Sequence, residues 1–228
     1  MKITYWSDYA CPYCYIGEVR LKKAIDELRL NDIELEMKAF QLDPTAAVHS
    51  VGDTQTRFAH KYGISYEEAG NRISEISNLG IAEGLDFKYA TTLFTNTMDA
   101  HRLTKLAQSK GSEIADKITE RLFKAYFTEN KELADKAVLQ QIGEECGLEQ
   151  DEVKELLAGD KFKAEVIADE QEAQAYGVHA VPFFIVAEKY AVPGAYDKDS
   201  FKQLLLKIVN NSETNAAVGM SCGPDGCH

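Results

Sequence analysis

The chain has 228 residues, with 25 lysines and arginines against 37 aspartates and glutamates, which gives a formal net charge of −12 at pH 7. A hydrophobic content of 45% and a charged content of 27% are typical of a globular protein and exclude a wholly disordered chain. The acidic excess argues against nucleic acid or an anionic membrane as the main partner, because binding to phosphates depends on lysine and arginine. The length fits one domain with an insertion, or two small domains.

The N-terminal segment has neither the apolar stretch nor the small-residue cleavage site of a secretory signal. No apolar run reaches the length of about 20 residues that spans a bilayer. We therefore expect a cytoplasmic protein. Its five cysteines are then more often catalytic or metal-binding than structural, because that compartment keeps thiols reduced.

The first forty residues predict a strand, a helix and a second strand. Residues 3–6 are β-branched and aromatic, which is typical of a short buried strand. Apolar residues spaced three and four apart predict a helix through Leu21, Ala24, Ile25 and Leu28. Residues 33–39 alternate between apolar and charged side chains, which predicts a strand with one face in the core and one face in water.

From about residue 46 to residue 176 the pattern is almost wholly helical. Ser65 and Glu68 form a capping box that opens a helix, which Gly80 is expected to end. Further helices are expected over residues 96–109, 112–127, 131–145, 150–158 and 160–176.

Strand composition returns at residues 183–187 and 190–192, and a helix is expected over residues 198–209. The chain therefore predicts the order β-α-β, a helical insertion, and β-β-α.

Cys11 and Cys14 frame a Cys-Pro-Tyr-Cys motif where the first strand leads into the first helix. Pro12 suits the first helical position, and a sulfur at a helix start faces unpaired N–H groups and the positive end of the helix dipole. Both effects favour the thiolate, which is the attacking species. The spacing predicts Cys11 as the exposed nucleophile and Cys14, one turn on, as the cysteine that resolves a mixed disulfide. Tyr13, inside the motif, is expected to influence the redox potential of the cysteine pair. Trp6 is expected to lie in the core.

The alternative interpretation is that Cys11 and Cys14 form one half of a zinc site, since zinc sites also use Cys-x-x-Cys. A second pair would be needed, and Cys222 with Cys227 has a permitted spacing. A helix that starts with proline suits redox chemistry better than a metal site. We expect no metal and no organic cofactor.

The Cys-Pro-Tyr-Cys motif after a strand, the helical insertion, and Gly-Val-His-Ala-Val-Pro-Phe-Phe at residues 177–184 together resemble the DsbA family of the thioredoxin superfamily. The similarity is greatest to its cytosolic FrnE-like branch and covers residues 1–210. The resemblance implies an α/β, thioredoxin-like fold with a large all-helical insertion.

The resemblance divides the chain into three parts. Residues 1–45 and 177–210 would form a discontinuous thioredoxin-like domain, and residues 46–176 a helical insertion domain. Residues 211–228, which are rich in small polar residues and have no apolar period, are expected to be a mobile tail.

The resemblance also implies a substrate-binding loop. The Val181–Pro182 peptide bond would be cis, and its loop would face Cys11 and receive an extended substrate, with Pro12 and Tyr13 on the other side. A proline that merely begins a strand is the alternative interpretation.

The tail ends in a second pair, Cys222 and Cys227, separated by the turn-forming sequence Gly-Pro-Asp-Gly. FrnE-like proteins sometimes carry such a pair, and the resemblance implies a secondary dithiol that exchanges with the first pair or shields it. The alternatives are an incidental disulfide and a metal site completed by His228. Two other residues, Cys146 and His101, are expected to pack within the core rather than to react.

The main hypothesis is a cytosolic thiol–disulfide oxidoreductase that acts on cysteine-containing proteins or low-molecular-weight thiols, with the direction of electron flow open. A glutathione-dependent isomerase or transferase on the same fold is one alternative, against which the intact cysteine pair counts. The other is a non-enzymatic adaptor whose thiols sense oxidation or hold zinc. No nucleic-acid or membrane partner is expected, and the sequence leaves the oligomeric state open.

Overall fold

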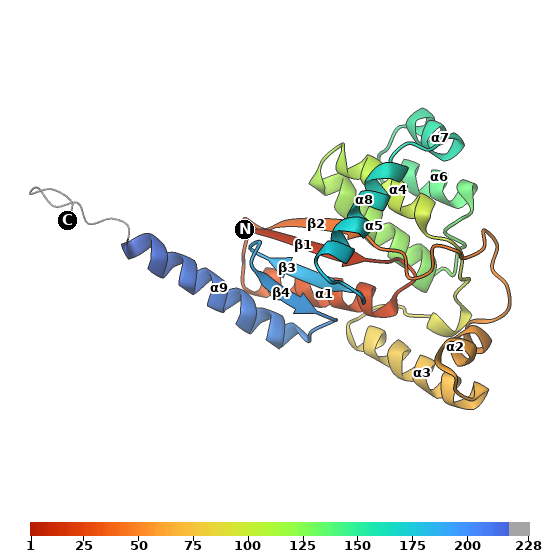
Figure 1. Ribbon diagram of the computed structural model, residues 1–228, viewed down its shortest axis with the longest axis horizontal. Helices are drawn as coiled ribbons and strands as arrows, with labels where there is room; N and C mark the ends of the chain where they lie inside the picture. The colour runs from red at the N-terminus through yellow and green to blue at the C-terminus, as the bar shows by residue number, and fades with distance from the viewer. Residues whose placement is uncertain (219–228) are drawn as a thin grey trace, which may run out of the picture.

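A four-stranded sheet lies at the centre of the computed structural model, which describes residues 1–218 and the side chains of residues 1–210 (Figure 1). Its strands are β1 (Lys2–Ser7), β2 (Glu34–Ala39), β3 (Phe183–Val186) and β4 (Tyr190–Pro193), in the order β2-β1-β3-β4. Strands β1 and β2 are parallel, whereas β3 is antiparallel to both β1 and β4. Because parallel neighbours need a crossover connection, helix α1 (Pro12–Glu27) joins β1 to β2.

Helices fill the chain between β2 and β3. They are α2 (Thr54–Tyr62), α3 (Tyr66–Ala82), the 3-10 helix η1 (Tyr89–Thr91), α4 (Met98–Gln108), α5 (Ser112–Phe127), α6 (Lys136–Glu145), α7 (Gln150–Ala158) and α8 (Lys163–Ala175). After β4 comes α9 (Lys198–Val218). The order confirms the predicted thioredoxin-like α/β frame with a large helical insertion. Along the part of the chain that the structure describes, no helix has both the length and the apolar character needed to cross a membrane.

Several helix boundaries differ from the prediction. Helix α2 is not predicted as a separate element, although Asp53 caps it by accepting a hydrogen bond from the Thr56 N–H, and Gly63, with a φ of 63°, ends it. Helix α6 begins five residues later than expected, because Asp135 acts as its N-cap. Helix α8 begins at Lys163 rather than at residue 160.

Gly80 does not end helix α3, which continues to Ala82. A Cβ atom at Gly80 would lie 2.5 Å from Cγ of Phe87, so the missing side chain makes room for that buried ring. Gly80 is therefore a packing residue within the helix, and the turn that follows is formed by Gly84, with a φ of 82°.

Helix α9 corrects the expected start of the tail, because it runs to Val218 rather than to residue 209. The prediction followed the loss of apolar periodicity, but no glycine or proline interrupts residues 198–218, so nothing in the sequence stops the helix. Residues 211–218 are therefore helical. The rest of the expected tail, residues 219–228, lies outside the described residues.

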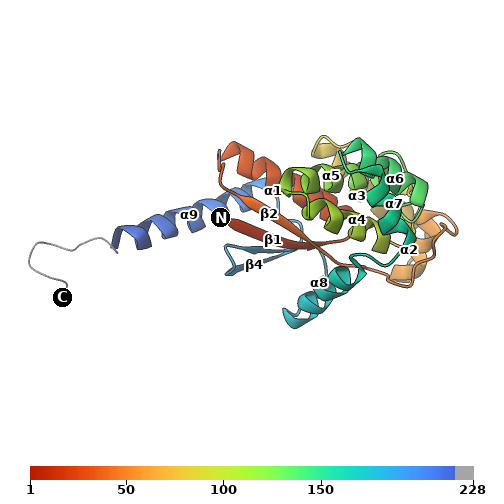
Figure 2. The same cartoon turned by 90° about the horizontal axis from the view of Figure 1, so that it is seen from above.

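Different helices cover the two faces of the sheet, with α1 on one side and α8 on the other (Figure 2). The alternation of side chains along β1 places Ile3 and Tyr5 in the main core, whereas Trp6 packs on the opposite face with Ala173 of α8. Trp6 is fully buried, as expected. Its indole N–H donates to the main-chain carbonyl of Asp169, at 2.9 Å.

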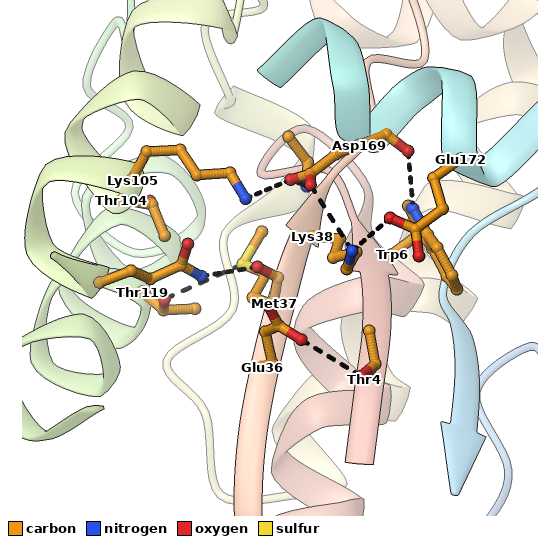
Figure 3. A network of polar contacts seen from close by, with 12 residues as sticks. Thr4, Trp6, Glu36, Met37, Lys38, Thr104, Lys105, Thr119, Asp169 and Glu172 are labelled. Atoms are coloured by element: carbon orange, nitrogen blue, oxygen red, sulfur yellow. Dashed lines mark hydrogen bonds and ion pairs between the residues drawn. The ribbon is translucent and has the colours of Figure 1, made fainter. Parts of the chain in front are cut away.

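The carboxylate of Asp169 connects α8 to both β2 and α4 (Figure 3). It accepts a hydrogen bond from the Ala39 N–H at 2.8 Å, and it pairs with Lys105 at 2.5 Å and with Lys38 at 4.0 Å. Lys38 also forms an ion pair with Glu172. The face of β2 that was expected to contact water is therefore covered by α8 at Lys38.

Replacing Asp169 with alanine is expected to lower the free energy of unfolding by about 3 kcal/mol, because the Lys105 ammonium and the Ala39 N–H lose a buried partner. Urea denaturation followed by circular dichroism measures the loss. Lys117→Ala, which breaks the exposed pair with Glu113, is the control and should cost less than about 0.5 kcal/mol. Equal, small losses for the two variants would show that Asp169 does not hold α8 against the sheet.

Candidate active site

Cys11 and Cys14 lie where β1 leads into α1. Cys11 is the N-cap of this helix and Pro12 stands in its first turn, as the sequence predicts. The Cys11 N–H donates to the carbonyl oxygen of Asp8 at 3.0 Å, and the Cys14 N–H donates to that of Cys11 at 3.1 Å. Both thiols are free, and the Cys11 side chain makes no capping bond with α1, so its sulfur stays available for other contacts.

Cys11 is less exposed than the sequence predicts. Only 4% of its surface and 1% of that of Cys14 are accessible. The cover over Cys11 comes from the loop before β3, because Cys11 Sγ donates to the carbonyl oxygen of Val181 at 3.5 Å. Access to the sulfur is instead through a cavity, in whose wall Cys11 lies.

Cys14 lies deeper, within α1. Burial raises the pKa of the Cys14 thiol well above its ordinary value, and hydrogen bonding with Cys11 and the charge of Cys11 act in the same direction. A thiol with a raised pKa stays protonated at neutral pH, and the thiolate is the nucleophile. The environment therefore disfavours Cys14 as the first attacking sulfur.

The loop before β3 lies against the cysteine motif. Its Val181–Pro182 peptide bond is cis, and the carbonyl oxygen of buried Pro182 accepts the Gly194 N–H at 2.8 Å. On the α1 side, a Cβ atom at Gly17 would lie 3.2 Å from Cγ of Pro182. A small residue at position 17 therefore lets the helix and the loop come close together.

A cavity of about 660 Å³ opens beside the motif. Cys11, Pro12, Tyr13 and Val181 line it, and Tyr13 is 43% exposed. Pro182 supports the loop and does not line the cavity. The volume lies within the range of about 300–1,000 Å³ that is typical of small-ligand sites.

The opposite part of the cavity wall comes from the helical insertion, for which the sequence predicts no functional residue. Arg57, Phe58 and Lys61 of α2 contribute to it, as does Ile76 of α3. The sequence does contain one indication of this wall: Arg57 and Lys61 are four residues apart, which places them on the same side of a helix. That signal has meaning only when α2 is recognised as a helix.

A buried pair, Asp8 and His101, lies next to the motif. His101 Nε2 is 3.7 Å from Asp8 Oδ1, and both side chains are at most 2% exposed. The Asp8 carboxylate also accepts the N–H groups of Ala10 at 3.2 Å and of Leu42 at 2.7 Å. Asp8 thereby fixes the segment before Cys11 to the loop after β2, and His101 occupies a packed position in the core.

The second cysteine pair, Cys222 and Cys227, lies outside the described residues. Among the side chains of residues 1–210, which the structure describes, no group of three or more histidine, cysteine or acidic residues is placed to hold a metal ion. Cys146 is a free thiol at the C-cap of α6 and is half-buried rather than fully buried.

Comparisons with known proteins place the chain among related sequences and structures. The family model described as DSBA-like thioredoxin domain matches residues 2–206. The uncharacterised protein YwbO of Bacillus subtilis is 26% identical over 208 residues, which cover 89% of this chain and 94% of that protein.

Among solved structures, a probable DsbA oxidoreductase from Streptomyces coelicolor is 31% identical with a TM-score of 0.84, and the match covers 100% of this chain and 98% of that one. The cytosolic disulfide reductase DsbM of Pseudomonas aeruginosa shares the fold at 13% identity, with a TM-score of 0.64 and coverage of 92% and 99%.

The raised pKa of Cys14 predicts a pH profile. In a Cys11→Ser variant, alkylation of Cys14 by iodoacetamide should rise with a midpoint above the ordinary thiol value of about 8.5, because burial, the largest cause of the shift, remains. Mass spectrometry of the peptide that contains Cys14 gives the rate at each pH, and the same variant unfolded in urea is the control. Identical midpoints in the folded and unfolded protein would contradict the assignment.

Proposed function

We propose a catalytic mechanism for this chain, which belongs to the DsbA-like thioredoxin domain family and is a disulfide oxidoreductase. Cys11 exchanges with the substrate, and Cys14 resolves the mixed disulfide. The observation that carries this assignment is the position of Cys11 Sγ, at the N-cap of α1, 3.5 Å from the Val181 carbonyl oxygen and in the wall of the cavity. Cys14 has no such access, being buried one turn further along the helix.

The exchange begins with the Cys11–Cys14 disulfide. A substrate thiolate attacks Cys11 Sγ, the bond between the two cysteines breaks, and its electron pair passes to Cys14 Sγ, which takes up a proton. A second substrate thiolate then attacks the substrate sulfur of the mixed disulfide and releases Cys11 as a thiolate at the N-terminus of α1. Two substrate thiols become one disulfide, and the protein gains two thiols. The reverse sequence reduces a substrate disulfide.

The environments of the two sulfurs suit these different roles. Cys11 lies at the N-cap of α1, where the positive end of a helix dipole favours negative charge. The raised pKa of Cys14 makes its sulfur a ready proton acceptor when the disulfide opens.

Substrates are seated by the Val181–Pro182 loop on one side, where Val181 lines the cavity and Pro182 supports it, and by Pro12 and Tyr13 on the other. Proline has no N–H, so the neighbouring main-chain groups are left to pair with an extended peptide. Low-molecular-weight thiols are the second substrate class, and the structure of DsbM with GSH supports it by analogy of fold. Cys222 and Cys227 form a secondary dithiol that exchanges with the first pair.

The proposed reaction takes place in the cytoplasm, as it does for DsbM, which is described as a cytosolic disulfide reductase. Its direction is set by the potential of the Cys11–Cys14 pair, measured by counting labelled thiols after equilibration in graded glutathione buffers. A midpoint near about −270 mV defines a reductase, and one between about −120 and −200 mV an oxidase or isomerase.

A trapping experiment tests the two cysteine roles. Cys14→Ser should accumulate a mixed disulfide with a reduced, cysteine-containing substrate protein after oxidation, because the resolving sulfur is missing and Cys11 remains. Cys11→Ser should accumulate none at position 14, since that sulfur is buried. Non-reducing electrophoresis and peptide mass spectrometry detect the adduct. Adducts in both variants, or in neither, would overturn the assignment of roles.

A further inference from the structure

The cavity beside Cys11 has a positively charged wall within an acidic protein. Arg57, Lys61 and Arg72 line it, with Glu75 as the one acidic lining residue in the part of the chain that the structure describes. The chain as a whole carries a net charge of −12. The local charge at the entrance to the reactive sulfur is therefore opposite in sign to that of the whole molecule.

Arg57 and Lys61 have no carboxylate partner among the described side chains, whereas Arg72 pairs with Glu68 at 2.7 Å. The Arg57 guanidinium lies 3.9 Å from the centre of the Phe94 ring. The face of an aromatic ring attracts a cation, which favours this position of the guanidinium without using its N–H donors. These two cations are therefore available to an anion that enters the cavity.

Burial makes an unpaired cation costly. Arg57 is half-buried, and a guanidinium removed from part of its water gains most from a carboxylate, which it can bind through two parallel hydrogen bonds. Lys61 lies one turn further along α2 on the same side, so both cations can contact one acidic ligand. Phe58 and Leu79 add apolar surface for the carbon skeleton of such a ligand.

We propose that Arg57 and Lys61 make the site selective for low-molecular-weight thiols that carry carboxylates. The inference rests on the proposed function, and it names the substrate class and two specificity-determining residues. The carboxylate binds to the two cations, and the ligand thiolate attacks Cys11 Sγ. The Cys11–Cys14 bond breaks with its electron pair passing to Cys14 Sγ, which is protonated. A second ligand thiolate releases the ligand disulfide and the dithiol protein.

Two probes that differ in carboxylate charge test the proposal. Glutathione carries two carboxylates, and glutathione diethyl ester has the same skeleton and thiol with both carboxylates esterified. Each reduces the oxidised, full-length protein, and alkylation followed by mass spectrometry of the tryptic peptide 3–20 gives the rate at Cys11 and Cys14. Each rate is divided by the rate of the same thiol with a small disulfide, which removes differences in intrinsic reactivity. The readout is the ratio of the glutathione rate to the ester rate.

The ratio should exceed one in the wild-type protein and fall about fivefold in Arg57→Met and in Lys61→Met, because each variant removes one charge-assisted contact to a carboxylate. Both probes use the same cysteines, so a change in folding or in cysteine reactivity cancels in the ratio. Arg29→Met removes the same charge beyond the far end of α1 and should leave the ratio unchanged.

An equal ratio in the wild type and in both cavity variants would overturn this inference and leave the oxidoreductase mechanism standing, since both probes still reduce the pair. A ratio that falls equally in Arg29→Met would also overturn it, because the effect would then come from net charge. If neither probe nor dithiothreitol reduced the Cys11–Cys14 disulfide, the proposed function itself would fail.

Discussion

The antiparallel pairing of β1 with β3 is the constraint on which the active site depends. Its register places Trp6, near the end of β1, opposite Phe183, at the start of β3. The segment that leaves β1 and the segment that enters β3 must therefore meet at the same edge of the sheet. One carries Cys11 and the other Val181, 170 residues away, and their contact at 3.5 Å follows from this register. A shift by one residue would turn every side chain of the strand to the opposite face and move the loop away from the sulfur.

Burial then gives two chemically identical thiols different environments. Cys11 borders the cavity at the N-cap of α1, whereas Cys14 is enclosed within the helix. The raised pKa of Cys14 is caused first by desolvation, so the difference follows from packing around α1 rather than from the motif itself. Gly17 contributes to that packing, because the absence of its side chain lets α1 approach Pro182.

The sequence alone predicts the parts of the molecule that depend on local patterns. The strand–helix–strand opening, the position of Cys11 and Pro12 at a helix start, and the return of strands after the helices all follow from periodicity and capping. Gly80 could not be interpreted from local patterns. Its role is to make room for the Phe87 ring, which packs against it from a separate segment. The exposure of Cys11 was also mispredicted, because its cover comes from a loop that is distant in sequence.

The cavity wall formed by α2 could not be predicted for the same reason. Nothing in the sequence near Arg57 or Lys61 connects them to Cys11, and only the fold of the insertion brings them to one cavity. The insertion thus supplies the positive charge of the cavity wall, and the α/β frame supplies the two cysteines.

The two electrostatic fields around the site act over different distances. The net charge of −12 is spread over the whole surface, and at physiological ionic strength exposed charges are screened beyond about 8 Å. A thiol that has entered the cavity is within contact range of Arg57 and Lys61, where less water and salt intervene. The acidic surface therefore opposes the approach of an anion only weakly, while the proposed contacts with Arg57 and Lys61 act at short range inside the cavity. Local charge in a small part of the insertion can in this way determine selectivity in a protein whose total charge has the opposite sign.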